Sequence, residues 1–227
     1  MCGKFTTRTG WTEVIDYIWR ETPPDLEDGA RLTLRVMNDL PVILFDPVNG
    51  RRRVVPMRWG FPHPKDWRRP QPIHARGETV DTVPAFAEAF ADGQRGIVLM
   101  ESFNEAPDES GPTRQHTITP DGPLAAAVIW RRFHCESGHG EGGSLFACVL
   151  VTVPANPLIA ALPTDRMPAF IAPDDWAVWL GEGDAGAAQA QACLKSMDGA
   201  RWTMAPEERA ARQRRASPTV SDPGGLF

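Results

Sequence analysis

The second residue of the chain, Cys2, carries chemistry that depends on its position. Aminopeptidases generally remove an initiator Met when a residue as small as Cys follows it, so we expect Cys2 to become the mature N-terminus. A free α-amine has a pKa of about 8, so part of it is an unprotonated nucleophile at neutral pH. This amine can form a Schiff base with an aldehyde, and the thiol of the same residue can then close a five-membered thiazolidine ring. Gly3 adds no side chain that would hinder a ligand.

Short segments that follow Cys2 keep a specific order and spacing along the chain. They are MRWGF (57–61), IHARGET (73–79), RGIV (95–98) with SFNE (102–105), and DRMP (165–168) with Trp176 and Trp179-Leu180. On these segments the chain resembles the SOS-response-associated peptidase (SRAP) family, whose members crosslink to abasic sites in single-stranded DNA. The similarity covers most of residues 1–181. Each segment is weak evidence by itself, but their order and spacing together are specific.

The resemblance implies a reaction centred on Cys2. After self-processing of Met1, the aldehyde of a ring-opened abasic sugar would react with the amine and thiol of Cys2, and the resulting thiazolidine crosslink would shield the lesion. In the family a glutamate assists opening of the sugar ring by proton transfer, and Glu105 occupies that position. A carboxylate beside a nucleophilic amine can also shuttle protons during imine formation.

The DNA-binding residues that the resemblance implies are mostly cationic. Arginines equivalent to Arg76 and Arg166 hold backbone phosphates in the family, a role that suits the guanidinium fork. Lys4 stands where an arginine is usual, so it keeps the charge but loses the bidentate geometry. Trp67 is the candidate for stacking on a base, whereas we expect Trp59 to belong to the core. The expected partner is single-stranded DNA that contains abasic sites.

Two positions of the expected active site depart from the family. The family's Asn-Ala-Arg reads His-Ala-Arg at residues 74–76, and Thr164 stands where the family has a histidine before Asp-Arg-Met-Pro. One hypothesis is that the imidazole has moved across the site, so that His74 supplies the hydrogen bonding and proton transfer of the missing histidine. The alternative is a diverged paralogue that reacts more slowly or with a different aldehyde. The expected catalytic set is Cys2, Glu105, His74 and Thr164.

Two functions of other classes stay open. An N-terminal-nucleophile amidohydrolase, such as the glutaminase domain of amidotransferases, also begins with Met-Cys-Gly. Such domains need characteristic Arg and Asn-Gly substrate loops, and the surroundings of Asn49-Gly50 do not match them. A non-catalytic single-stranded DNA-binding module would keep the cationic residues and would be indifferent to Cys2.

The remaining Cys and His residues give no sign of a disulfide framework or a metal site. The four cysteines form no CxxC pair, and a reducing compartment keeps them as thiols. Cys135 lies near His134 and His139 in a glycine-rich part of the chain, but this spacing matches no common zinc pattern. We therefore expect no metal and no other cofactor.

Short strands and a few short helices must position these residues. Short apolar runs bounded by turn signals predict strands over residues 32–37, 41–46, 53–58, 96–103, 115–119, 124–131 and 146–153. Helices are predicted over residues 12–20, 83–91, 155–161, 173–180 and 185–196. Because there is no regular βαβ alternation, this order favours an α+β domain, with a mostly antiparallel, partly open, barrel-like sheet and short flanking helices. We expect one domain over residues 1–205 and a weakly ordered tail over 206–227.

Composition and charge limit the classes of partner. The 227 residues carry a net charge of −5, and no apolar run approaches the about 18 residues that a membrane span needs. Residues 51–76 are locally basic, with eight Lys or Arg against Asp66 alone, and they include Trp59, Phe61 and Trp67. Such a stretch suits a groove for single-stranded nucleic acid, or a solvated loop. We expect a cytoplasmic monomer that associates with the nucleoid on DNA damage and not with a membrane.

Overall fold

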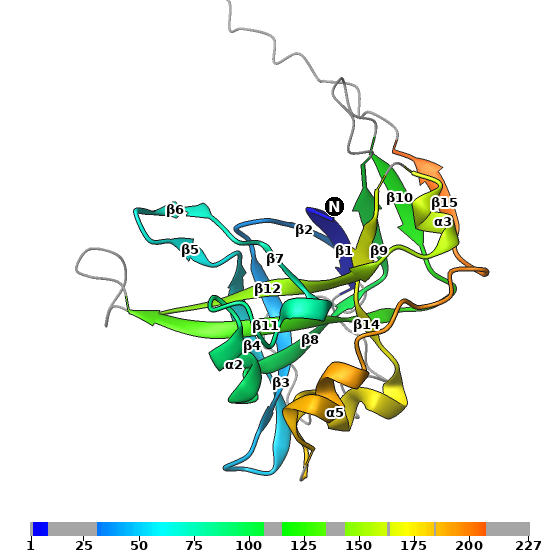
Figure 1. The fold of residues 1–227 in the computed structure, drawn as a ribbon. Coiled ribbons are helices and arrows are strands. Elements are labelled where there is room, and N and C mark those ends of the chain that lie inside the picture. Colours follow the sequence, from blue (N-terminus) through cyan, green and yellow to red (C-terminus); the bar gives the residue numbers. More distant parts are fainter. Residues whose placement is uncertain are drawn as a thin grey trace, which may run out of the picture.

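Strands dominate the fold, which we describe from a computed structural model (Figure 1). It describes residues 2–8, 31–106, 115–134, 144–162, 164–183 and 185–207, without the side chains of Arg8 and Trp67. The strands are β1 (Lys4–Arg8), β2 (Arg31–Arg35), β3 (Asp39–Asp46), β4 (Arg51–Trp59), β5 (Pro62–His63), β6 (Asp66–Pro70), β7 (His74–Arg76), β8 (Arg95–Met100), β9 (Ser102–Glu105), β10 (His116–Thr119), β11 (Leu124–His134), β12 (Ser144–Pro154), β13 (Arg166–Pro168), β14 (Phe170–Ile171) and β15 (Thr203–Pro206). The short helices are η1 (Gly77–Thr79), α2 (Ala87–Ala91), α3 (Pro157–Ala160), η2 (Pro173–Asp175), α4 (Trp176–Leu180) and α5 (Ala187–Ala192).

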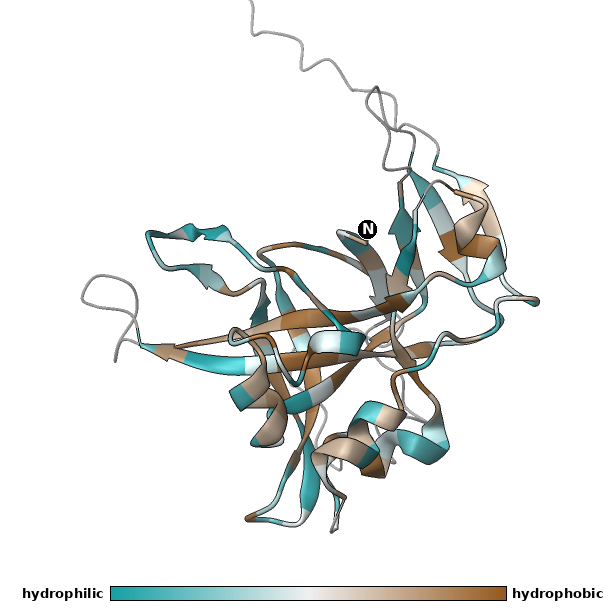
Figure 2. Cartoon of the chain, viewed as in Figure 1, coloured by the Kyte–Doolittle hydropathy of each residue, from teal (hydrophilic) through white to brown (hydrophobic). Residues whose placement is uncertain are grey.

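Five strands close into a small barrel. β12 pairs with β4, β4 with β3, β3 with β8, β8 with β11, and β11 pairs back with β12. Only the β12–β4 pair of this ring is parallel, so the barrel is mixed but mostly antiparallel. β11 and β12 are apolar on both faces over much of their length, because they are buried on both sides (Figure 2). The predicted fold class is confirmed.

A second, antiparallel sheet carries the start of the chain. Its strand order is β15-β10-β9-β1-β2, so β1 is paired on both sides. Phe5 lies opposite Leu34 of β2 and opposite Phe103 of β9. The Phe5 ring is fully buried, and its centroid lies 5.6 Å from that of Trp59 at the end of β4. This packing joins the second sheet to the barrel.

The predicted elements agree with the structure best where strands are long and apolar. The strands predicted over residues 41–46 and 53–58 are confirmed as β3 and β4, which pair with each other, and the later strands and helices occur close to their predicted places. The predicted strand 96–103 is instead divided at Glu101, where the chain leaves the barrel and enters the second sheet. The predicted helix 12–20 lies outside the described residues.

The helices are short and peripheral. Only residues 87–91 of the predicted helix 83–91 are α-helical, and residues 83–86 form a bend followed by turns. The predicted helices 155–161 and 185–196 are likewise shorter, as α3 and α5. None of the helices within the described residues is long and apolar enough to cross a lipid bilayer.

A glycine in β8 marks a close approach of two barrel strands. A Cβ atom on Gly96 would lie 2.5 Å from Cγ1 of Val42 and 2.9 Å from the backbone O of Ile43 in β3. We expect Gly96→Ala to lower the free energy of unfolding by about 1–3 kcal/mol, because the strands must move apart to admit the methyl group. Urea denaturation measures this change.

Gly122 provides the matched control, because a Cβ atom there would meet no atom within 4 Å. We expect Gly122→Ala to change the free energy of unfolding by no more than about 0.5 kcal/mol. Equal effects of the two substitutions would contradict the close approach at Gly96.

Candidate active site around Cys2

The pairing of β1 with β9 brings Cys2 beside Glu105. Phe5 lies opposite Phe103, so the antiparallel register carries the start of the chain toward the end of β9. The backbone N–H of Cys2 donates a hydrogen bond to the Glu105 carboxylate. The backbone N–H of Asn104 donates one to Sγ of Cys2. Strand register therefore brings Cys2 into contact with residues about 100 positions away in the sequence.

Burial changes the protonation of both groups. Cys2 and Glu105 are each 1% exposed. Burial raises the pKa of Glu105 to about 7, and the hydrogen bond from the Cys2 N–H opposes this shift. Burial, followed by the charge of Glu105, raises the pKa of the Cys2 thiol well above its ordinary value. At neutral pH the thiol is therefore protonated, whereas the Glu105 carboxyl can both donate and accept a proton, as a proton shuttle must.

His74 lies on the other side of Cys2, at the start of β7. This strand runs parallel to β12, with His74 opposite Leu150. Nε2 of His74 is 2.7 Å from the backbone O of Cys2, and a carbonyl oxygen only accepts, so Nε2 carries the proton. Nδ1 is buried and has no hydrogen-bond partner among the described residues. Burial lowers the pKa of His74 to about 4, so the ring is neutral at pH 7.

Trp59 supports the imidazole from the core. It is fully buried, and its Nε1 donates a hydrogen bond of 3.2 Å to the backbone O of Ile73. The centroids of its ring and the His74 ring are 6.4 Å apart, in an edge-to-face arrangement. The prediction that Trp59 belongs to the core is confirmed. Trp59 fixes the segment that enters β7.

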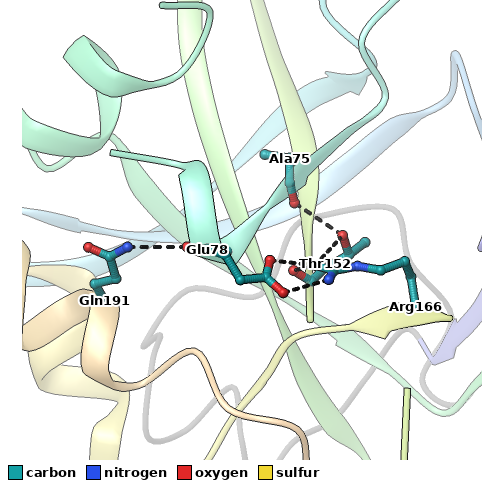
Figure 3. A network of polar contacts seen from close by, with 6 residues as sticks. Ala75, Glu78, Thr152, Arg166 and Gln191 are labelled. Carbon is teal, nitrogen blue, oxygen red and sulfur yellow. Dashed lines mark hydrogen bonds and ion pairs between the residues drawn. The ribbon is translucent and has the colours of Figure 1, made fainter. Parts of the chain in front are cut away.

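A polar network built on the buried Arg166 and the half-exposed Glu78 anchors the same strand (Figure 3). Nη1 and Nη2 of Arg166 donate to the two carboxylate oxygens of Glu78 over 2.6 and 2.8 Å, and Nη2 also donates to the backbone O of Thr152 over 2.6 Å. The hydroxyl of Thr152 in turn donates to the backbone O of Ala75, over 3.3 Å. The hydrogen bond from Arg166 lowers the pKa of Glu78. The network therefore ties β12, β13 and η1 to the strand that carries His74.

Two of the predicted DNA-binding cations differ in exposure. Arg166 is 7% exposed and already binds Glu78 and Thr152, so its role at a phosphate stays a prediction. Arg76 is exposed, two residues beyond His74 on the same strand. Of these two, Arg76 is the one with its side chain open to solvent.

The other predicted residues have separate surroundings. Lys4 is buried and forms an ion pair with Glu207, the residue directly after β15. The hydroxyl of Thr164 lies 3.5 Å from the backbone O of Arg166, and no described hydrogen bond joins it to Cys2. Trp67 belongs to β6, but its side chain lies outside what the structure describes.

The basic stretch of residues 51–76 does not form one surface. Arg51, Arg52 and Arg53 begin β4, at the end of the molecule opposite the N-terminus in Figure 1. Arg52 forms an ion pair with Glu182, and Arg58 is buried. The remaining cations of the stretch are exposed and follow the β5–β6 hairpin and β7; they are Lys65, Arg68, Arg69 and Arg76.

Sequence reasoning missed two residues beside the site. Glu207 falls in the predicted tail, yet its carboxylate binds Lys4 and its N–H donates to the backbone O of Gln115. His116 of β10 lies directly opposite Glu105 of β9. Neither residue stands in a motif, and only strand register brings them to the site.

The raised pKa of Glu105 has a consequence for stability. Its pKa is about 7 in the folded protein against an ordinary 4.5, so the folded state binds the extra proton and stability falls as pH rises from about 4.5 to 7. Glu105→Gln removes this effect. We therefore expect the effect of Glu105→Gln on the free energy of unfolding, measured by urea denaturation, to be more favourable at pH 8 than at pH 4.5 by at most about 3 kcal/mol.

The exposed Glu88 of α2 is the matched position for this experiment. Glu88→Gln should show little difference between the two pH values. His74 also titrates in this range, but it is present in every variant compared and its contribution cancels. An effect of Glu105→Gln that does not depend on pH would contradict the raised pKa.

Comparisons with known proteins place the chain in a family. A family profile described as SOS response associated peptidase (SRAP) matches residues 1–211. A search of curated proteins gave no match. Among solved structures, a protein from Bacteroides thetaiotaomicron is similar at 17% identity and a TM-score of 0.72, covering 91% of this chain and 92% of that one.

Two structures from Bordetella bronchiseptica share the fold as well. One protein is 19% identical with a TM-score of 0.72, over 92% of this chain and 100% of that one. A phage-related protein is 18% identical with a TM-score of 0.64, over 92% of this chain and 95% of that one. At these identities the structures show the fold alone, whereas the family profile spans nearly the whole sequence. The chain belongs to the SOS response associated peptidase (SRAP) family.

Proposed function

We propose that the protein binds single-stranded DNA and crosslinks to abasic sites through Cys2, once Met1 has been removed. The observation that carries this proposal is the buried contact between the backbone nitrogen of Cys2 and the carboxylate of Glu105. After removal of Met1, that nitrogen is the α-amine of the chain. A nucleophilic amine beside a carboxyl that titrates near pH 7 is the pairing that imine chemistry requires.

The reaction proceeds with balanced proton transfers. Opening of the abasic sugar breaks the bond between C1′ and the ring oxygen, and it moves one proton from the C1′ hydroxyl to that oxygen. The Cys2 amine then attacks the C1′ aldehyde, and water leaves to give the imine. The thiol finally adds across the C=N bond, with sulfur on carbon and its proton on nitrogen. One water is released in total, and Glu105 takes up and returns a proton at successive steps.

The state of the Cys2 thiol supports this order of events. Because burial keeps it protonated, the thiol is a weak nucleophile until a partner lies next to it. The amine therefore reacts first. The imine bond then holds the target carbon close to the thiol, and addition of sulfur to this carbon closes the five-membered ring.

Exposed cations on β7, β2 and the β5–β6 hairpin support the DNA partner. Arg76 follows His74 on β7, and the β5–β6 hairpin presents Lys65, Arg68 and Arg69. Arg35 of β2 is exposed as well, directly across from Lys4. Cations along a path to a reactive residue would bind successive phosphates and hold the lesion at Cys2.

The proposal predicts a covalent adduct. We expect purified protein, checked by mass spectrometry for loss of Met1, to form a heat-stable adduct with single-stranded DNA that carries one abasic site. Denaturing gels should show no heat-stable adduct with Cys2→Ala, because the substitution keeps the α-amine but removes the thiol, so only a reversible imine can form. Cys193→Ala, in a buried position at the end of α5, is the matched control and should react as the wild type does.

Each other result assigns a different function. DNA binding without an adduct would make the protein a non-catalytic single-stranded DNA-binding module. Hydrolysis of glutamine without DNA binding would make it an N-terminal-nucleophile amidohydrolase. An adduct that persists in Cys2→Ala would place the reactive group elsewhere.

The ion pair between Lys4 and Glu207 predicts a change in DNA affinity. A phosphate can use Lys4 fully only if it competes with the Glu207 carboxylate. We expect Glu207→Gln to tighten binding of single-stranded DNA by about three- to ten-fold at low salt, measured by fluorescence anisotropy. Glu182→Gln, which releases Arg52 at the far end of β4, is the control and should change affinity less than about two-fold. Equal affinities for Glu207→Gln and wild type would exclude Lys4 from the DNA path.

A further inference from the structure

A second imidazole shares a sheet face with Glu105. β9 and β10 pair antiparallel, and His116 lies directly opposite Glu105. Directly opposite residues point to the same face, with Cβ atoms about 4.5–5.5 Å apart. Two residues further along the same register, Phe103 lies opposite Ile118, and both are fully buried. Because side chains alternate along a strand, His116 points to the same inward face as these residues and Glu105.

The buried ring nitrogen of His116, Nδ1, is available for a hydrogen bond to Glu105. Its Nδ1 is buried and has no hydrogen-bond partner among the described residues. On the other side of β10, the residue opposite His116 is Pro206, which has neither an N–H group nor a polar side chain. The polar group that shares this face with His116 across β9 is the carboxyl of Glu105.

The other candidates for proton transfer, His74 and Thr164, form hydrogen bonds to backbone oxygens. His74 donates its Nε2 proton to the backbone O of Cys2, and its low pKa keeps the ring neutral. This hydrogen bond makes His74 a fixed support for Cys2 and a poor proton carrier at neutral pH. Thr164 has only a hydroxyl to offer, and its described hydrogen bond goes to the backbone O of Arg166.

We propose that His116 is a positioning residue for the crosslinking reaction, which hydrogen-bonds the Glu105 carboxyl and exchanges protons with it between steps. An imidazole can donate at one nitrogen and accept at the other, so it can return to Glu105 the proton that it removed. No net proton is consumed. The inference rests on the proposed function. It assigns proton exchange with Glu105 to His116 of β10, and it assigns the positioning of Cys2 to His74.

Single-turnover kinetics and binding together test the role of His116. The reactive substrate is single-stranded DNA with one abasic site. The binding probe is the same strand with a tetrahydrofuran analogue, which has no aldehyde. We expect His116→Ala to lower the rate of adduct formation at saturating protein by at least about ten-fold. This loss is smaller than the about 100- to 10,000-fold that a general acid–base group contributes to a rate. Affinity for the analogue should change less than about two-fold, and added imidazole should restore part of the rate.

Two further variants complete the experiment. His134→Ala removes an exposed imidazole at the end of β11 and should leave both rate and affinity unchanged. His116→Gln keeps a hydrogen-bond donor of similar size but cannot carry a proton, so we expect it to be as slow as His116→Ala. If His116→Ala does not fold, the rate of His116→Gln decides the question.

The outcomes separate this inference from the function on which it rests. If wild-type protein forms no adduct, the proposed function fails and the inference fails with it. If wild type reacts and either folded His116 variant reacts at the same rate, only the inference is overturned. Parallel losses of rate and affinity in His116→Ala, without rescue by imidazole, would show that the residue is merely structural and would also overturn it.

Discussion

The pairing of β1 on both of its edges is the constraint on which the rest of the site depends. The first residues of a chain commonly fray, because nothing pairs with them. Here β2 and β9 hold β1 from both sides, and Phe5 packs against Trp59 in the core. Cys2 consequently lies inside the protein, and the end of β9 has to place Glu105 against it. The unusual protonation of the site follows from this burial.

The interior of the site carries little fixed charge, because burial favours the neutral form of each titratable group. The thiol of Cys2 is protonated, the ring of His74 is neutral, and Glu105 is divided between acid and base forms near pH 7. Permanent charge lies outside this group. Lys4 is compensated by Glu207, and Arg76 faces solvent. In the proposed function, the chemistry would therefore use buried groups and the attraction of DNA would use exposed ones, so that each could be strong without disturbing the other.

The sequence predicted those elements whose side chains are buried on a regular pattern. The β3–β4 hairpin and the apolar strands β11 and β12 have this character. β1 and β7 were missed, since they are short or polar and owe their conformation to pairing with distant strands. The division between β8 and β9 was missed because the apolar run continues through the change of sheet at Glu101.

The same limit applies to the site. Motif resemblance named Cys2, Glu105 and His74, and the structure places all three together. Glu207 and His116 join them through register that no local pattern encodes. The burial of Cys2 also sets an order of events during synthesis. β9 emerges about 100 residues after β1, which at 5–20 residues per second allows about 5–20 s before the two can pair. If an external aminopeptidase removes Met1, and not self-processing, it has to act within that interval, and the proposed maturation of the Cys2 amine would then be coupled to translation speed.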